Sequence, residues 1–266
     1  MLSHNTISFI KALHLKKKRN EHGLFLAEGD KLVRELLNSD FVVKQIYAHA
    51  DWLREHSKLV SRDIETNGAT PAEMERISTL VTAPSVLAVV EIPEVTIDAE
   101  ELLSGYTLIL DGIRDPGNMG TMIRTADWFG IRTIIASDDC VEHWSPKVVQ
   151  ASMGSLTRVR IVNADLKEVF NDVAEMSTKS NIDAPAIYGT FMDGHSIYGE
   201  TFAPSGLIVI GNEANGIRKE TESFIDRRIA VPSFNGSGNG PESLNAAVAT
   251  ALVLGELRRQ KTKIVD

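Results

Sequence analysis

Apolar and polar positions along the chain form two blocks of strand-like and helical patterns. In the first block, helix-spaced apolar residues alternate with short apolar runs. The predicted helices span residues 6–14, 30–37 and 71–78, and the predicted strands span residues 23–28, 42–48 and 86–92. This pattern predicts a small α/β domain over residues 1–97, followed by a linker over residues 98–105.

The second block, residues 106–266, is more regular. Predicted strands span residues 107–111, 133–136, 158–162, 186–190, 207–210 and 228–231, and predicted helices span residues 119–129, 145–156, 166–176 and 244–260. Because strands alternate with helices throughout, the block predicts βαβ units that build a parallel sheet. The predicted fold class is therefore α/β, with a parallel-sheet domain at the C-terminal side.

Composition narrows the class of protein. The chain has 266 residues and is 43% hydrophobic, which is typical of a protein with a real core. It has neither the apolar segment of a secretory signal after Met1 nor a run of about 18 apolar residues that could span a membrane. The single Cys140 excludes an internal disulfide and favours a reducing cytoplasm, and the histidines show no metal-ligand spacing. We therefore predict a cytoplasmic protein without a metal site.

Charge is uneven along the chain. The net charge of −8 argues against binding to nucleic acid by bulk electrostatics. Residues 11–19 nevertheless form a basic run that has no acidic residue and five cations, namely Lys11, Lys16, Lys17, Lys18 and Arg19. A basic run of this length is either a solvated surface or a contact with phosphate groups of RNA.

Three polar clusters lie where a ligand of a parallel sheet would bind. They are the residues 118–120 with Arg124 one turn later, the residues 211–216, and the residues 243–245. Each follows a predicted strand, and ligands bind at the carboxyl ends of parallel strands. Glycines in one such loop can simply make a tight turn, but three polar loops at one sheet edge favour a binding site. The chain lacks a P-loop and a dinucleotide-binding glycine motif in its first βα turn.

The order and spacing of these clusters resemble the three motifs of the SpoU/TrmH family, the RNA 2′-O-ribose methyltransferases of the SPOUT class. The first motif matches at Asn118, Gly120 and Arg124, the second at Gly211, Glu213 and Gly216, and the third at Ser243, Leu244 and Asn245. The resemblance covers nearly the whole chain. It implies that Arg124 is the main catalytic residue, supported by Asn118, Glu213, Ser243 and Asn245.

The resemblance also implies a cofactor and a special topology. Members of the family bind S-adenosylmethionine in a deep trefoil knot formed by the C-terminal segment. The implied cofactor-binding residues are Thr190, Gly211, Ile229, Pro232 and Leu244. The loop over residues 232–243 is several residues longer than the family pattern, with residues 235–241 inserted.

The N-terminal block resembles the L30e-like substrate-binding domain that many rRNA-directed members carry. The resemblance lies in residues 10–29, which include the basic run, and it makes Lys16, Lys17, Lys18 and Arg19 candidate RNA-binding residues. Members of the family work as homodimers. The apolar residues 246–257 fit either a dimer helix or a core helix.

These observations predict a cytoplasmic enzyme that transfers a methyl group from S-adenosylmethionine to a ribose 2′-hydroxyl, with 23S rRNA as its substrate. Two alternatives stay open, namely the same reaction on tRNA and a non-catalytic RNA-binding ribosome assembly factor. At single residues, Arg124 could instead form an ion pair with Asp127 or Asp111. Glu213 could instead oppose the dipole at a helix N-terminus.

Overall fold

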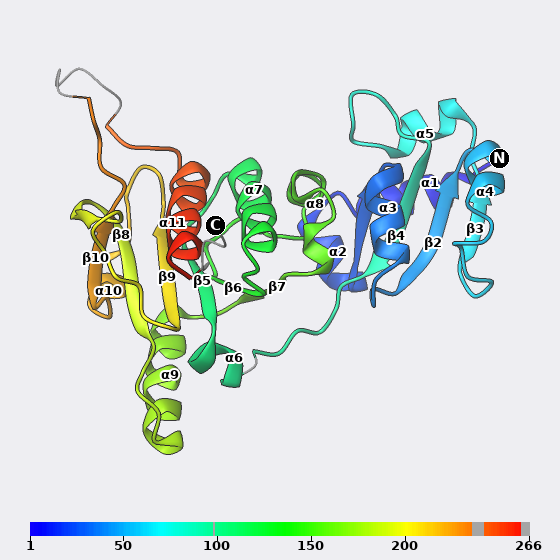
Figure 1. Cartoon of the computed structure of the whole chain (residues 1–266). Coiled ribbons are helices and arrows are strands. Elements are labelled where there is room, and N and C mark those ends of the chain that lie inside the picture. The colour runs from blue at the N-terminus through cyan, green and yellow to red at the C-terminus, as the bar shows by residue number, and fades with distance from the viewer. Residues whose placement is uncertain (98, 236–241, 262–266) are drawn as a thin grey trace, which may run out of the picture. The chain divides into compact units, whose positions relative to one another are not determined.

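A computed structural model describes residues 1–97, 99–235 and 242–261 (Figure 1). The chain forms two compact units. Unit 1 combines Met1–Glu94 with Glu142–Thr157, and unit 2 combines Val95–Val141 with Arg158–Asp266. Among the described residues, no helix is long and apolar enough to cross a membrane.

Unit 1 contains a mixed four-stranded sheet. Its strands are β1 (Leu24–Glu28), β2 (Val43–Ala48), β3 (Glu65–Gly68) and β4 (Val86–Glu91), in the order β1-β4-β2-β3. β4 is antiparallel to both of its neighbours, whereas β2 and β3 are parallel. β4 is buried almost throughout, which confirms its prediction from a continuous apolar run.

Helices pack around this sheet and bury the predicted apolar faces. They are α1 (His4–Ala12), α2 (Lys16–His22), α3 (Asp30–Leu37), α4 (Ala50–Glu55) and α5 (Pro71–Ile77). Ile7, Ile10 and Leu13 from α1 and its C-cap join one buried cluster, as their helical spacing predicts. A capping box starts α5: the Thr70 side chain accepts from the Glu73 amide, and the Glu73 carboxylate accepts from the Thr70 amide.

A segment from the middle of the chain completes unit 1. Residues 142–157 contain α8 (Pro146–Ser152) and a 3₁₀ turn, Ser155–Thr157, where one helix over residues 145–156 was predicted. Trp144, which is 8% exposed, places its ring centroid 4.8 Å from that of Phe25 and 6.0 Å from that of Phe41. This segment, predicted as part of the second domain, therefore packs with unit 1.

Unit 2 contains a six-stranded sheet whose described ladders are all parallel, which confirms the prediction. The strands are β5 (Tyr106–Asp111), β6 (Thr133–Ala136), β7 (Arg160–Asn163), β8 (Ala186–Ser196), β9 (Gly206–Gly211) and β10 (Arg227–Ala230), in the order β10-β8-β9-β5-β6-β7. β5 and β9 lie side by side at the centre and are fully buried. Their continuous apolar runs are typical of central parallel strands.

Helices cover this sheet, and one of them, α7, carries the residues of the first motif. They are α6 (Ala99–Ser104), α7 (Pro116–Trp128), α9 (Leu166–Ser180), α10 (Lys219–Glu222) and α11 (Ala246–Lys261). Ile109 and Val209 from the central strands share a buried cluster with Phe170 of α9. The helices α7 and α11 pack against each other, as Figure 1 shows. Passage of the C-terminal segment through a knot stays a prediction from the family resemblance.

Candidate active site

One residue from each of the three motifs joins a single chain of hydrogen bonds. Asn245 Nδ2 donates to Asn118 Oδ1 at 2.9 Å, and Asn118 Nδ2 in turn donates to the Glu213 carboxylate. These contacts join residues 127 and 95 positions apart in the chain. The fold therefore brings together three side chains that the sequence placed in separate loops.

Helix caps position the two asparagines. Asp115 precedes α7 as its N-cap and accepts from the Asn118 amide at 2.7 Å, and Pro116 occupies the first position of the helix. Asn245 Oδ1 accepts from the amides of Ala247 and Val248 at the start of α11. Because the Asn245 oxygen serves the helix, its side-chain N–H group is left to donate to Asn118.

A tight loop after β9 presents Glu213. The main chains of Asn212 and Gly216 exchange two hydrogen bonds, and Gly216 has a φ of +66°. At Gly211 a Cβ atom would lie 2.3 Å from the Gly216 carbonyl carbon, so only glycine permits this close approach. Glu213 lies in the turn and not at a helix N-terminus, since α10 begins at Lys219. The structure thus does not support the helix-dipole alternative for Glu213.

Arg124 lies on the exposed surface of α7, one turn beyond the motif glycine Gly120. Among the described residues it has neither a hydrogen bond nor an ion-pair partner. Asp127 is paired with Arg158 at 2.9 Å, and Asp111 is paired with Arg218. The ion-pair alternative for Arg124 is therefore not what the structure shows, and its guanidinium is open to a ligand.

The predicted cofactor residues lie in or after three adjacent strands, except Leu244, which lies just before α11. Thr190 in β8 donates its hydroxyl to the Val209 carbonyl at 3.2 Å, and Gly211 ends β9. Ile229 in β10 is fully buried, whereas the Leu244 side chain is 44% exposed and Pro232 is partly exposed. Ser243 is exposed. Of the predicted insertion, residues 236–241 lie outside the described residues.

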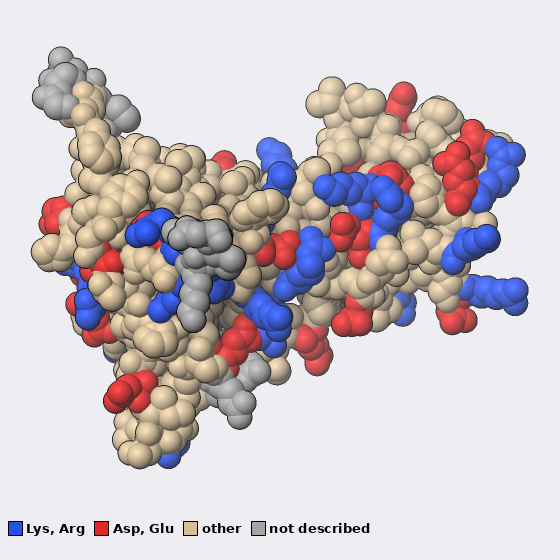
Figure 2. All heavy atoms as spheres, viewed as in Figure 1, with Lys and Arg blue, Asp and Glu red and all other residues tan. Residues whose placement is uncertain are grey.

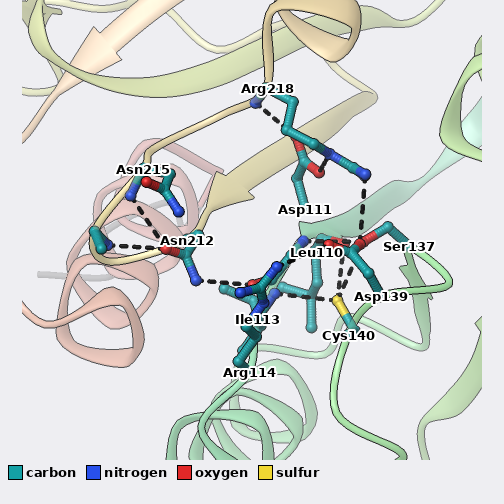
Figure 3. Close-up of polar contacts among 12 residues, drawn as sticks. Leu110, Asp111, Ile113, Arg114, Ser137, Asp139, Cys140, Asn212, Asn215 and Arg218 are labelled. Atoms are coloured by element: carbon teal, nitrogen blue, oxygen red, sulfur yellow. Dashed lines mark hydrogen bonds and ion pairs between the residues drawn. The ribbon is translucent and has the colours of Figure 1, made fainter.

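A second group of polar residues, not predicted from the sequence, lies beside the loop of Asn212 and Asn215 (Figure 3). Asp111, fully buried at the end of β5, accepts from the Arg218 amide at 2.9 Å and from Arg218 Nε at 2.5 Å. Partial burial lowers the pKa of Arg218, but the carboxylates of Asp111, Asp139 and Glu220 outweigh it and raise that pKa above its ordinary value. The sequence signal that could have indicated this group is an acidic residue at the end of a predicted apolar strand, Thr107–Asp111.

Cys140 lies beside the same group of residues. Its thiol is buried, and it accepts from the Ile113 amide at 3.2 Å. Burial raises the pKa of the Cys140 thiol, so this side chain supports the loop and is not an activated nucleophile. Among the described residues, no group of three or more His, Cys, Asp or Glu side chains could hold a metal ion.

The basic run forms the helix α2, and its cations have different surroundings. Lys16 and Lys17 are exposed, and Lys18 pairs with Glu21 at 2.7 Å. Arg19, by contrast, is 2% exposed, donates to the Leu13 carbonyl at 2.8 Å and pairs with the Glu142 carboxylate. The interpretation of Arg19 as an RNA-binding residue is therefore corrected, because its guanidinium is already enclosed by protein groups.

Comparisons with known proteins cover both units. Residues 105–255 match the model of the SpoU rRNA methylase family, and residues 4–88 match the MRM3-like substrate binding domain. The chain is 29% identical over 254 residues to the 23S rRNA (guanosine(2553)-2′-O)-methyltransferase RlmP of Bacillus subtilis, covering 93% of this chain and 94% of that protein. It is 33% identical over 156 residues to the 23S rRNA (guanosine-2′-O-)-methyltransferase RlmB of Neisseria meningitidis serogroup B, covering 58% of each.

Two solved structures are similar to this chain over nearly its whole length. A TrmH-family protein from Porphyromonas gingivalis superimposes with a TM-score of 0.84 at 36% identity, over 98% of this chain and 99% of that one. The SpoU methyltransferase AviRb from Streptomyces viridochromogenes, solved in complex with AdoMet, gives a TM-score of 0.84 at 25% identity over 98% of each chain.

Proposed function

Since this chain belongs to the SpoU rRNA methylase family, we propose that it transfers a methyl group from S-adenosylmethionine to a ribose 2′-hydroxyl of 23S rRNA. The observation that carries this proposal is the hydrogen-bond chain from Asn245 through Asn118 to Glu213, with Asn118 in the same helix, α7, as the exposed Arg124. A family member that had become a binding protein would have no need to keep these three side chains together. A bacterial rRNA substrate would also place the protein in the cytoplasm.

The five predicted cofactor-binding residues fit S-adenosylmethionine by their chemistry. Thr190, Gly211, Ile229, Pro232 and Leu244 carry no charged side chain, so they offer main-chain polar groups and apolar surface to an adenine and a thioether. Gly194 lets the main chain of β8 pass close to Ile229, because a Cβ atom at this position would lie 2.6 Å from the Ile229 carbonyl carbon. When bound, the cofactor supplies an electrophilic methyl group.

The protein side chains then have to orient and activate the nucleophile. A ribose hydroxyl is a poor nucleophile at neutral pH, so catalysis requires its alignment and stabilisation of the charge that develops on its oxygen. Arg124 carries a permanent positive charge, because a guanidinium group stays protonated in proteins, and it suits contact with the hydroxyl and an adjacent phosphate. Asn118 and Glu213 are hydrogen-bonded to each other near the start of the same helix and present polar groups there.

The test separates Arg124 from cofactor binding. Arg124→Ala is expected to abolish transfer of labelled methyl groups to rRNA, while calorimetry finds an S-adenosylmethionine affinity equal to that of the wild type. Arg132→Ala is the matched control, since Arg132 is also exposed in unit 2 but lies outside the motifs. Equal loss of turnover in both variants, or loss of cofactor binding in Arg124→Ala, would refute the assigned role.

The exposed lysines of α2 are the proposed RNA contact of unit 1. On the face that Figure 2 shows, Lys and Arg are interspersed with Asp and Glu, so attraction of RNA must be local. Each phosphate contact adds about 0.7 to 0.9 to the slope of log affinity against log salt. Lys16→Glu/Lys17→Glu should weaken rRNA binding and flatten this slope, whereas Lys31→Glu/Lys58→Glu, at two other exposed lysines of unit 1, should do neither.

An apolar stripe supports a homodimer as part of the same proposal. Leu244, Val248 and Leu252 recur every four residues and are 44%, 48% and 39% exposed. Core packing accounts for the opposite, buried face of α11 but not for this stripe. Light scattering should find a dimer, and Val248→Glu should give a folded monomer. A monomeric wild type would refute the dimer alone.

A further inference from the structure

The loop that carries Glu213 is anchored at both ends to the C-terminal end of β5, at Asp111 and Gly112. At its start, Asn212 Nδ2 donates to the Gly112 carbonyl at 2.9 Å. At its end, the Arg218 amide and Nε donate to the Asp111 carboxylate. Asp111 also pairs with Gly211 in the ladder between β5 and β9, so the anchors lie beside the last paired residues of the sheet.

The loop between the anchors has little freedom of its own. Asn212 Oδ1 accepts from the amides of Ala214 and Asn215 at 3.0 and 3.1 Å. The main chains of Asn212 and Gly216 exchange hydrogen bonds of 2.8 and 3.1 Å. The side chain of Asn212 thus has two roles, which Figure 3 shows. Its oxygen accepts hydrogen bonds from within the loop, and its nitrogen donates to the Gly112 carbonyl outside the loop.

The second anchor uses a buried charge. Asp111 is 0% exposed, and Arg218 brings both a main-chain and a side-chain donor to it. A buried carboxylate is costly without partners, so the Arg218 end of the loop has a strong preference for this one position. Arg218 Nη1 also lies 3.4 Å from Asp139, which itself accepts from the Ser137 hydroxyl.

We infer that Asn212 and Arg218 are positioning residues, which act on the methyl transfer through Glu213 by holding its carboxylate against Asn118. The inference rests on the proposed function and adds a role for two residues that are not among the matched positions of the three family motifs. Neither residue needs to touch RNA or cofactor. Their effect on turnover must therefore depend on the presence of the Glu213 carboxylate.

A double-mutant cycle tests this dependence. Asn212→Ala and Arg218→Lys should each lower the single-turnover rate constant of methyl transfer by about tenfold in the presence of Glu213. The lysine variant keeps the charge but loses the Nε–H donor. In a Glu213→Ala background the same changes should have less than about a twofold effect, because residues that act as a unit are not additive. Equal fold-losses in both backgrounds would overturn the inference.

Two controls report whether any loss is general. Asn163→Ala removes a similar bond, from an asparagine amide to the Ser137 carbonyl at 3.2 Å, at the end of β7. Arg227→Lys alters an exposed pair with Glu200 in the same unit. Both should retain wild-type turnover in both backgrounds. If they instead reproduce the losses of the anchor variants, the anchors have no special role.

Amide hydrogen exchange followed by NMR tests the anchoring without any activity. The amides of Ala214, Asn215 and Gly216 should exchange at least about tenfold faster in Asn212→Ala, since they lose their acceptor or their loop closure. Unchanged exchange would overturn the inference. A wild-type protein that methylates no rRNA would refute the proposed function, and the exchange measurement would then decide the anchoring alone.

Discussion

Two long-range polar contacts of this protein differ in their access to solvent. In unit 1, Arg19 meets Glu142 across 123 residues of sequence, with side chains that are 3% and 12% exposed. In unit 2, Asn118 meets Glu213 across 95 residues, and the adjoining Asn245 is exposed. The first contact is enclosed and stabilises the fold, whereas the second stays open at the end of a parallel sheet, where a ligand can reach it.

This difference shows why residue type alone is a weak guide to function. Both contacts join a polar side chain of a helix, Arg19 in α2 or Asn118 in α7, to a carboxylate in a loop. A buried ion pair leaves no donor or acceptor for a substrate, since burial requires that each is satisfied within the protein. The open contact keeps unused hydrogen-bonding capacity, which is what a binding site needs.

The largest expected effect concerns the segment that encloses the first contact. Trp144→Ala should lower the free energy of unfolding by about 4 kcal/mol, because it leaves a cavity beside Phe25 and Phe41. Urea unfolding measures this loss. Trp128→Ala, at a tryptophan that is 84% exposed, is the control and should change it little. A loss below about 1 kcal/mol at Trp144 would show that residues 142–157 are not part of unit 1's core.

Removal of one partner of the enclosed pair should have the next largest effect. Arg19→Ala leaves the Glu142 carboxylate without its cation and should cost about 3 kcal/mol. Arg19→Met/Glu142→Leu should recover most of that stability, because apolar side chains can replace a buried pair. In contrast, Lys17→Ala at an exposed position should cost less than about 0.5 kcal/mol. Equal costs at Arg19 and Lys17 would contradict the distinction between them.

At the open contact, stability and activity should separate. Asn245→Ala removes a helix N-cap and should cost about 1 kcal/mol, and it should also lower turnover because Asn118 loses its donor. Asp165→Ala removes the cap of α9, which accepts from the Lys167 and Glu168 amides, and should cost a similar amount with normal turnover. Normal turnover in both variants would show that Asn245 is only a cap.

The last effect should appear only in acid. Amides of Thr70 and Leu2 and the Thr70 hydroxyl donate to Glu73, and they lower its pKa from 4.5 to about 2. Because the folded-state pKa is depressed, this stabilisation is complete above pH 4.5 and is lost as pH falls toward 2. Glu73→Gln should flatten this part of the stability–pH curve. An unchanged slope between pH 4.5 and 2 would contradict the assignment.

Much of the secondary structure followed from the sequence pattern. The helix Asp30–Leu37 and the strand Thr133–Ala136 have the predicted bounds, because hydrophobic period and turn residues act locally. The parallel sheet of unit 2 followed from the alternation of strands and helices. The helix α2 did not, since its first residues Lys16–Arg19 have no apolar stripe of their own.

The open site was predictable as a set of residues, because its three motifs keep a recognisable spacing in the chain. Its hydrogen bonds were not predictable: the spacing does not show that Asn118 would lie between Glu213 and Asn245, since α7, the loop after β9 and the start of α11 meet only in the folded unit. The anchors Asp111 and Arg218 were missed for the same reason, because an acid at a strand end carries no sign of its partner.

Long-range packing alone established the rest. The local pattern could not show that Arg19 would be enclosed, since its partner Glu142 lies 123 residues away. Nor could it show that residues 142–157 would join unit 1, because an amphipathic segment packs equally well against any complementary apolar face. Period and turn chemistry encode which elements form, whereas the partners of a charge or an aromatic ring depend on which distant segments the completed fold brings together.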